Sequence, residues 1–420
     1  MQSTKGFLGL GLVVSINLGL QFLFQWYIIV HFGAGSQTDA FFGAMALPQF
    51  ILLVLSGSLT MVLIPVISKY SGDEFLEESW NYFQGVGLLF AGISLLLLLT
   101  ASWWVGLILP GFKGADLVLT INMARIQIAG MLFSALLSVV WAAHSAKGNF
   151  VLIETTSILA NCIAFAILLL VSKTMSIYTA SWISVARILL QVLLLMKIMG
   201  PYRRPHFSSP SFKEVWKKLK PLMAGNLYYK TDMLVDRYLT STGGAGQLTL
   251  FNMAQQLYSV GNSILSKVLI NTMIPEMSKA NAAGDTDTYN KIFKKRLILS
   301  FISTSVIFII ILVLGEWILG LVFSFKKFTL ADVANLWWLL ILLVGYWIGA
   351  LTGGVTSASF YAKGDTSTPT VIGAVNFTLY LPVKIFCYYK FGITGLAIAV
   401  SSYYIASFLA QLYFLRKHLK

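Results

Sequence analysis

Charged residues are scarce in this 420-residue chain: Asp, Glu, Lys and Arg together make up 11% of it, whereas 57% is hydrophobic. Soluble domains carry about 25% charged residues, so this much apolar surface cannot be buried in one water-soluble core. Acidic residues are the rarer charges, with 16 Asp and Glu against 30 Lys and Arg, which gives a net charge of +14. The composition excludes an ordinary soluble protein and predicts an integral membrane protein.

Residues for metal, redox or nucleotide chemistry are also few. The two cysteines, Cys162 and Cys387, lie inside apolar runs, and the four histidines are isolated, so neither a disulfide nor a metal site is expected. The chain lacks a G-x-x-x-x-G-K-[ST] phosphate loop, and no carboxylate pair shares a long loop outside the membrane. We therefore predict neither an enzyme nor a resident cofactor.

Long hydrophobic runs recur along nearly the whole chain. Each is long enough for the roughly 20 helical residues that cross a bilayer about 30 Å thick. The runs are continuous rather than alternating, which favours an all-α protein over a β-barrel. We predict about 12 transmembrane helices, centred near Gly19, Leu53, Leu95, Leu132, Ala164, Leu189, Met233, Gly261, Ile309, Leu343, Leu379 and Ile405.

One stretch of the sequence occurs twice. Its first copy contains Gln37, Phe41, Ala44, Leu47 and Pro65, which recur at one constant offset as Gln247, Phe251, Ala254, Leu257 and Pro275. Later in each half, Ala146-Lys147-Gly148 and Asn161 recur as Ala362-Lys363-Gly364 and Asn376. We expect an N-terminal six-helix lobe at 1–200, a basic cytoplasmic connector at 201–220 and a C-terminal six-helix lobe at 221–420. Such parallel repeats are typical of transporters with the substrate site between the lobes.

The positions of Lys and Arg predict the orientation in the membrane. If the N-terminus is cytoplasmic, most of the cations lie on the inner side, which supports an even number of spans and two cytoplasmic termini. The basic run from Arg203 to Lys220 is then a connector that orients the protein and contacts lipids, and no nucleic-acid partner is expected. We predict a multi-pass protein that contacts membrane lipids.

Ionisable residues inside the predicted spans are the candidates for function, because burying them in a membrane is costly. The seventh span concentrates them, with Asn226, Lys230, Asp232, Asp236 and Arg237 on adjoining arcs of one helix. Two interpretations stay open: these residues line a polar cavity, or they form internal salt bridges that hold helices in register.

Further ionisable residues lie in other spans. Asp39 begins the second span, and Arg187 and Lys267 are expected deep in the sixth and eighth, whereas Arg125 and Lys384 are expected near an interface. Buried cations suit an anionic substrate such as a diphosphate. We predict substrate binding by Arg187, Lys230, Arg237, Lys267 and Asn226, and coupling to H⁺ or Na⁺ by Asp39, Asp232 or Asp236.

Several short motifs together carry a family resemblance. In order they are Thr38-Asp39-Ala40-Phe41-Phe42, Leu47-Pro48, Ile64-Pro65, Asp236-Arg237, Ile274-Pro275 and Tyr361-Ala362-Lys363-Gly364-Asp365-Thr366. Their order and spacing resemble the MviN/MurJ-type flippases of the multidrug, oligosaccharidyl-lipid and polysaccharide exporter superfamily. The resemblance implies a MATE-like fold in the bacterial cytoplasmic membrane. It also implies a flippase that moves undecaprenyl diphosphate-linked sugars outward by alternating access.

The sequence departs from the peptidoglycan-precursor flippases of that family in the first span. Those proteins carry arginines there and shortly after the second-span proline, whereas this chain has Ser15, Asn17, Gln21 and Gln25, and Gln49 follows Pro48. We therefore expect a capsule, exopolysaccharide or O-antigen unit as cargo, with a polysaccharide polymerase or glycosyltransferases as partners. The alternatives are a lipid II flippase, a MATE-like small-molecule exporter, and a membrane enzyme or assembly scaffold.

Overall fold

The structure is a computed structural model that describes residues 4–207, 212–217, 219, 227, 228 and 230–418. Every regular element in this part of the chain is a helix, which confirms the all-α prediction. Close contacts divide the chain into an N-terminal unit, Met1–Thr242, and a C-terminal unit, Gly243–Lys420. The lobe boundaries proposed from the sequence stay a prediction, because part of the 201–220 connector lies outside the described residues.

Eight helices among the described residues are long and apolar enough to cross a membrane, or nine if one bent pair counts as a single span. This agrees with a multi-pass membrane protein, but the predicted number of twelve spans is not confirmed. The seventh predicted span, centred near Met233, begins among residues that the structure does not describe. The helix α16 (Ser367–His418) contains two predicted spans joined at a kink.

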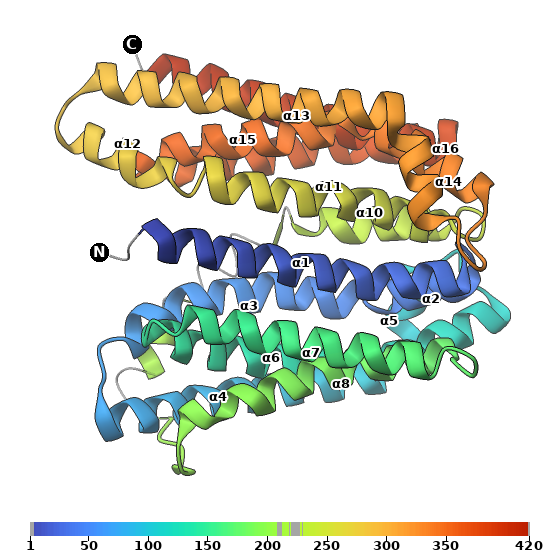
Figure 1. Ribbon diagram of the computed structural model, residues 1–420, viewed down its shortest axis with the longest axis horizontal. Coiled ribbons are helices and arrows are strands. Elements are labelled where there is room, and N and C mark those ends of the chain that lie inside the picture. Colours follow the sequence, from blue (N-terminus) through green and yellow to red (C-terminus); the bar gives the residue numbers. More distant parts are fainter. Residues whose placement is uncertain (1–3, 208–211, 218, 220–226, 229, 419–420) are drawn as a thin grey trace. The chain divides into compact units, whose positions relative to one another are not determined.

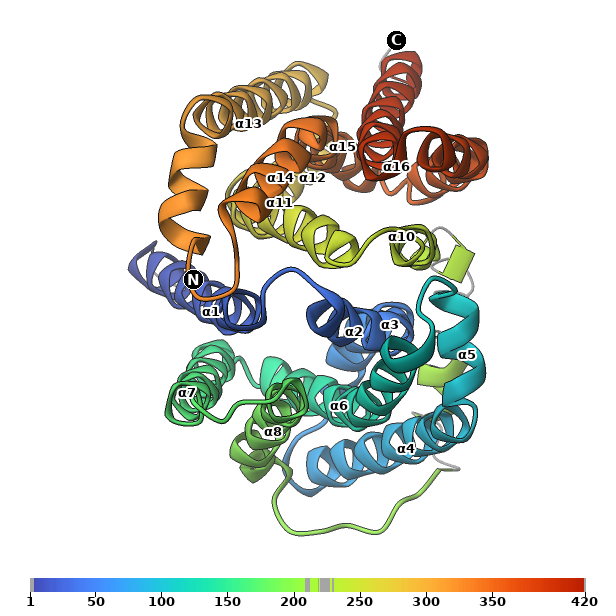
Figure 2. The same cartoon turned by 90° about the vertical axis from the view of Figure 1, so that its right-hand side faces the viewer.

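The N-terminal unit is built around one central helix. Its elements are α1 (Thr4–Phe32), α2 (Ser36–Ala44), α3 (Ala46–Ile67), α4 (Gly72–Leu99), α5 (Ala101–Ile108), α6 (Gly114–Ala146), α7 (Phe150–Leu170), α8 (Ile177–Leu195), the 3₁₀ turn η1 (Met196–Met199) and α10 (Asp232–Ser241). Figure 2 shows α6 enclosed by α2, α3, α4 and α8, all of which contact it. Fully buried small residues such as Ala124, Ala135 and Ala143 let these neighbours approach α6 closely.

The C-terminal unit is arranged around α15. Its helices are α11 (Gln247–Leu269), α12 (Met273–Ala282), α13 (Thr286–Phe323), α14 (Leu330–Leu342), α15 (Val344–Ala362) and α16. Figure 1 shows α13 and α15 running side by side, and α15 also contacts α11, α12 and α16. On α13 the apolar side chains of Phe301, Ile309 and Val313 are more than half exposed. Such a surface suits lipid rather than water.

Two glycines bring the backbones of α15 and α16 into contact. A Cβ atom on Gly349 would lie 2.7 Å from the carbonyl carbon of Tyr404, and one on Gly345 would lie 2.8 Å from the carbonyl oxygen of Ser401. These glycines are four residues apart, the spacing that lets membrane helices pack at short distance. Their lack of a side chain therefore sets the separation of the two helices.

The predicted span centred on Leu343 is broken there. Helices α14 and α15 meet at an angle of 44°. The hydroxyl of Ser401 lies at the break, donating to the carbonyl oxygen of Leu342 at 2.6 Å and accepting from the amide of Tyr346 at 3.3 Å. In a continuous helix Tyr346 would donate to Leu342 directly, so the kink arises because a side-chain oxygen is inserted into that hydrogen bond.

Helix α16 is a hairpin of two arms. Gly392, with φ 61° and ψ −147°, has a conformation that favours glycine and ends the first arm. The arms pack together beyond it, since Asn376 Nδ2 donates to Ser407 Oγ at 3.1 Å and the rings of Tyr380 and Tyr403 lie 5.8 Å apart. Asn376 and Ser407, 31 positions apart in the sequence, are therefore brought together by this hairpin.

The second duplicated motif has the same geometry in both units. Gly148 and Gly364 have φ of 77° and 79°, and each ends its helix in a turn of the Schellman type. The preceding lysines also match: Lys147 Nζ lies 4.2 Å from the ring centroid of Phe75, and Lys363 Nζ lies 5.1 Å from that of Tyr289. The repeat thus preserves a helix end together with a cation–π contact.

The C-terminal copy of this motif continues into the start of α16. Hydrogen bonds from Thr368 and Ser367 lower the pKa of the Asp365 carboxyl below its usual value. The carboxylate is therefore charged at neutral pH and caps the first turn of the helix.

Candidate functional site

The N-terminal unit contains a polar cavity of about 140 Å³. Side chains of α1, α2, α3, α6 and α8 line it, and its apolar part includes Phe24, Phe41 and Met131. Its polar lining consists of Gln25, Gln49, Gln127, Ser134, Ser184 and Arg187. The cavity thus combines one permanent cation with several neutral hydrogen-bonding groups.

Arg187 supplies the positive charge of this cavity. Its Nη1 donates a hydrogen bond of 2.6 Å to Asn161 Oδ1, and its guanidinium carbon lies 4.9 Å from the ring centroid of Phe24. Among the described residues, no carboxylate forms a salt bridge with it. A guanidinium has five N–H donors and binds phosphate oxygens in a forked geometry, so Arg187 is suited to an anionic ligand. Its predicted role in substrate binding fits this position but stays a prediction.

Asn161 connects Arg187 to other polar side chains. Asn161 Nδ2 donates to Asn17 Oδ1 at 2.9 Å, and Asn17 Nδ2 donates to Glu154 Oε2 at 2.8 Å. Glu154 was not among the predicted site residues, because a single carboxylate in the first turns of an apolar helix resembles an interfacial residue. The repetition of Asn161 as Asn376 was the one available signal for this network.

A second group of charges joins α2 and α10, which are in contact. Asp39, Asp236 and Arg237 are all buried, with exposed fractions of 3%, 5% and 8%. The charges of both carboxylates act on the guanidinium of Arg237. Asp232 is half-buried at the start of α10. The structure therefore brings Arg237 close to two of the predicted coupling carboxylates, and both interpretations of this cluster, a polar cavity lining or internal ion pairs, stay open.

The remaining predicted cations lie elsewhere. Lys230 Nζ donates to the backbone carbonyl of Leu53 in α3 at 3.0 Å. Lys267 is exposed on α11 rather than buried as expected, and Asn226 lies outside the described residues. Lys384, expected near an interface, is 1% exposed, with Nζ 5.6 Å from the ring centroid of Tyr403. The exposure of Lys267 and the burial of Lys384 depend on which side of each helix is covered by protein, and hydropathy does not show this.

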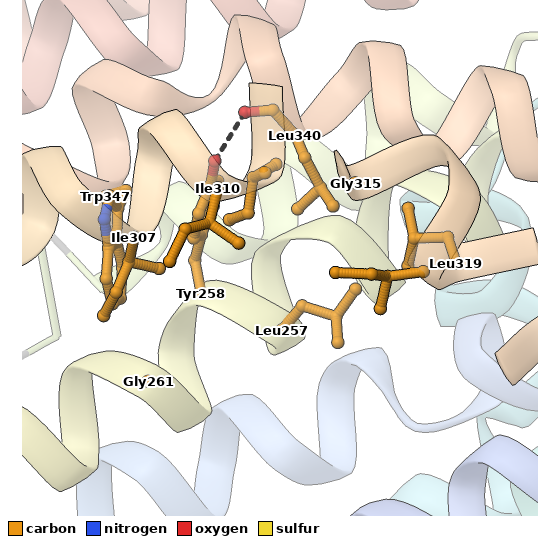
Figure 3. Close-up of a pocket in the computed structure, with 11 residues that line it drawn as sticks. Leu257, Tyr258, Gly261, Ile307, Ile310, Gly315, Leu319, Leu340 and Trp347 are labelled. Carbon is orange, nitrogen blue, oxygen red and sulfur yellow. Dashed lines mark hydrogen bonds between the residues drawn. The ribbon is translucent and has the colours of Figure 1, made fainter. Parts of the chain in front are cut away.

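The C-terminal unit has an apolar pocket of about 230 Å³ between α11, α13, α14 and α15. Figure 3 shows Leu257, Ile310 and Leu319 around it, together with the hydrogen bond of 2.7 Å from the Tyr258 hydroxyl to the Leu340 carbonyl. Trp347 Nε1 donates to the carbonyl of Thr304 at 2.9 Å. Because both polar groups of the lining are already bonded, the pocket suits a hydrocarbon ligand.

Comparison with known proteins identifies relatives across nearly the whole chain. The family model described as "Lipid II flippase MurJ" matches residues 28–420. A lipid II flippase MurJ of Burkholderia cenocepacia is 22% identical, with 81% of this chain and 70% of the relative aligned. A probable lipid II flippase MurJ of Buchnera aphidicola is 24% identical, with 96% and 81% aligned.

Two solved structures show the same fold. A lipid II flippase MurJ in an inward closed conformation has a TM-score of 0.81 at 19% identity, over 97% of this chain and 87% of that chain. An inward-facing MATE multidrug transporter of the MOP superfamily has a TM-score of 0.80 at 15% identity, over 97% and 98%. These similarities establish a MATE-like fold and do not themselves distinguish the cargo.

The relatives correct the predicted cargo. The matched family and both sequence relatives are named for lipid II, so the prediction of a capsule, exopolysaccharide or O-antigen unit is wrong. That prediction depended on the missing arginines of the first span. In the structure Arg187 of α8 lines the cavity beside the α1 residues Phe24 and Gln25, so the lack of arginines in the first span does not leave the cavity without a cation.

Proposed function

The chain belongs to the MurJ family of lipid II flippases, and from this premise we propose that it moves lipid II across the membrane by alternating access. As a member of this family it is a transporter and not an enzyme. Its cargo is a lipid-linked molecule with a diphosphate head group and a polyprenyl chain. The N-terminal cavity and the C-terminal pocket have the chemistry that these two parts require.

The observation that carries this proposal is Arg187 in the polar cavity. The guanidinium lines the cavity without a salt bridge to any described carboxylate, and glutamine and serine side chains surround it. A diphosphate would accept hydrogen bonds from Arg187, and the neutral groups would bind sugar hydroxyls. The cavity is too small for a whole head group in the conformation described, so a wider state is needed during transport.

The apolar pocket supports the lipid part of the proposal. Its volume of about 230 Å³ exceeds the roughly 150 Å³ of an apolar cavity that binds benzene. Two of its lining residues, Ile310 and Ile318, are 45% and 38% exposed on α13, so the pocket borders the surface that suits lipid. A hydrocarbon chain could enter it from the bilayer without crossing a polar layer.

The proposal places the protein in the bacterial cytoplasmic membrane with both termini in the cytoplasm. The excess of Lys and Arg on the inner side supports this orientation. Membrane lipids surround the protein, whereas a polysaccharide polymerase or glycosyltransferase partner stays a prediction.

A transport assay tests the proposed function directly. The full chain is reconstituted in vesicles that contain fluorescent lipid II, and a membrane-impermeant quencher reports how much lipid II reaches the outer leaflet. We expect lipid II to move faster than in protein-free vesicles, whereas a fluorescent phospholipid of the same membrane does not. Equal rates for lipid II with and without the protein would contradict the proposal.

Coupling to an ion gradient is a further part of the proposal. Asp39 and Asp236 are buried carboxylates whose charges act on Arg237, and Asp232 lies one turn away from Asp236. Such a carboxylate can take up H⁺ or bind Na⁺. We expect Asp39→Asn to make lipid II transport insensitive to an imposed H⁺ or Na⁺ gradient. If lipid II transport in D39N, D232N and D236N responds to the imposed gradient as strongly as in the unchanged protein, these carboxylates are not the coupling site.

A further inference from the structure

Four side chains on α1, α7 and α8 form a directed chain of hydrogen bonds. Arg187 donates to the oxygen of Asn161, the nitrogen of Asn161 donates to the oxygen of Asn17, and the nitrogen of Asn17 donates to Glu154. The three distances are 2.6, 2.9 and 2.8 Å. Each asparagine thus accepts a hydrogen bond from the direction of Arg187 and donates one in the direction of Glu154.

The chain of hydrogen bonds joins a cation at one end to a carboxylate at the other. Hydrogen bonds in series polarise one another, and the effect is stronger where water is excluded. Asn17 and Asn161 are 7% and 2% exposed, so the middle of the chain is buried. The oxygen of Asn17 also accepts from Ser157 Oγ at 3.0 Å, which helps to hold that amide in place. Arg187 and Glu154 are therefore connected by hydrogen bonds through two neutral side chains.

We propose that Glu154 is the resting counter-charge of Arg187 and that an anionic head group competes with this hydrogen-bond chain. The inference rests on the proposed function, because it assigns the diphosphate to Arg187. While the cavity is empty, Asn161 holds the guanidinium and Glu154 balances its charge. A diphosphate gives Arg187 a closer anion, and on release the chain re-forms and displaces the head group.

The role of Glu154 makes a distinctive prediction for binding and turnover. In the Glu154→Gln variant the amide oxygen can still accept from Asn17, so the chain keeps its geometry but loses its negative end. We expect this variant to bind a prenyl diphosphate about three- to tenfold more tightly, because one competing charge is gone. We also expect its maximal lipid II transport rate to fall, because release is slower. A purely structural role would weaken both properties together.

The binding experiment uses the full chain in lipid nanodiscs, with farnesyl diphosphate as the probe and farnesol as the uncharged control. Glu154→Asp, which retains the charge, should restore affinity and transport toward those of the unchanged protein. Glu77→Gln is a matched control, because Glu77 is an exposed carboxylate on α4. It should leave affinity and transport unchanged.

Two outcomes separate this inference from the proposed function. If Arg187→Ala weakens diphosphate binding but E154Q binds with unchanged or lower affinity, the counter-charge role is wrong and the Arg187 site stands. If R187A itself binds farnesyl diphosphate as well as the unchanged protein does, Arg187 does not bind the head group. The role inferred for Glu154 is then wrong as well. Equal tightening of farnesol binding in E154Q would also overturn the inference, because the effect would not depend on the ligand's charge.

Discussion

Replacing Arg187 by alanine should reduce the rate of lipid II transport at subsaturating lipid II by roughly 10- to 100-fold, the loss expected for a hydrogen bond to a charged group of about 1.5–3 kcal/mol. The substitution removes the only cation among the residues that line the described N-terminal cavity. The transport rate of Arg187→Lys should lie between those of the unchanged protein and Arg187→Ala, because an ammonium keeps the charge but not the forked donor geometry. Lipid II transport in reconstituted vesicles, at equal protein content, measures all three proteins.

The matched control for this prediction is Arg125→Ala. Arg125 is exposed on α6, and its guanidinium makes a long hydrogen bond of 3.4 Å to Asn122. This variant removes the same type of side chain outside the cavity and should transport lipid II at the unchanged rate. The cavity assignment is wrong if R125A and R187A lose activity equally, or if R187A loses none while remaining folded.

The largest effect on stability is expected for Gly349→Ala. The new Cβ would lie 2.7–2.9 Å from three atoms of Tyr404, two of which belong to the backbone, so α15 and α16 must separate. Overpacking of this kind costs about 1–3 kcal/mol, more than the gain of up to about 1 kcal/mol from replacing glycine within a helix. The midpoint temperature of unfolding in detergent, followed by tryptophan fluorescence, should therefore fall.

Gly353→Ala provides the control on the same helix. A Cβ at Gly353 would have Phe408 Cβ as its nearest neighbour, at 3.9 Å, which is an ordinary contact. Only the helix-propensity term remains, so G353A should melt at the same or a higher temperature. A G349A protein as stable as G353A would show that the two helices do not meet at Gly349.

The membrane class, the helical fold and the duplication could all be predicted, because each depends on features that extend over many residues. The hydropathy of a span is averaged over about 20 residues, and a repeat is recognised from matches along half of the chain. The break at Leu343 could not be predicted, since it depends on one hydroxyl from Ser401, distant in sequence. The predicted span was centred on this residue because its composition alone is uninterrupted.

The site was less predictable, because the importance of a side chain depends on its neighbours. Arg187 was selected as a buried cation, and the structure places it in a cavity. Arg237 was selected by the same reasoning, yet it lies with Asp39 and Asp236. Glu154 was not selected, since only the positions of Asn17 and Asn161 reveal that it is connected to Arg187. No periodicity in the sequence encodes such a connection between three helices.

The kink at Leu343 has a consequence for how α14 and α15 can move. In the bent form, the Ser401 hydroxyl satisfies both the carbonyl of Leu342 and the amide of Tyr346. If the helix straightened, these two groups would bond to each other, and the hydroxyl could bond to a carbonyl of its own helix. Neither form would leave a polar group unpaired in the membrane, where such a group costs several kcal/mol. The bent and the straight form of this joint would therefore contain the same number of hydrogen bonds.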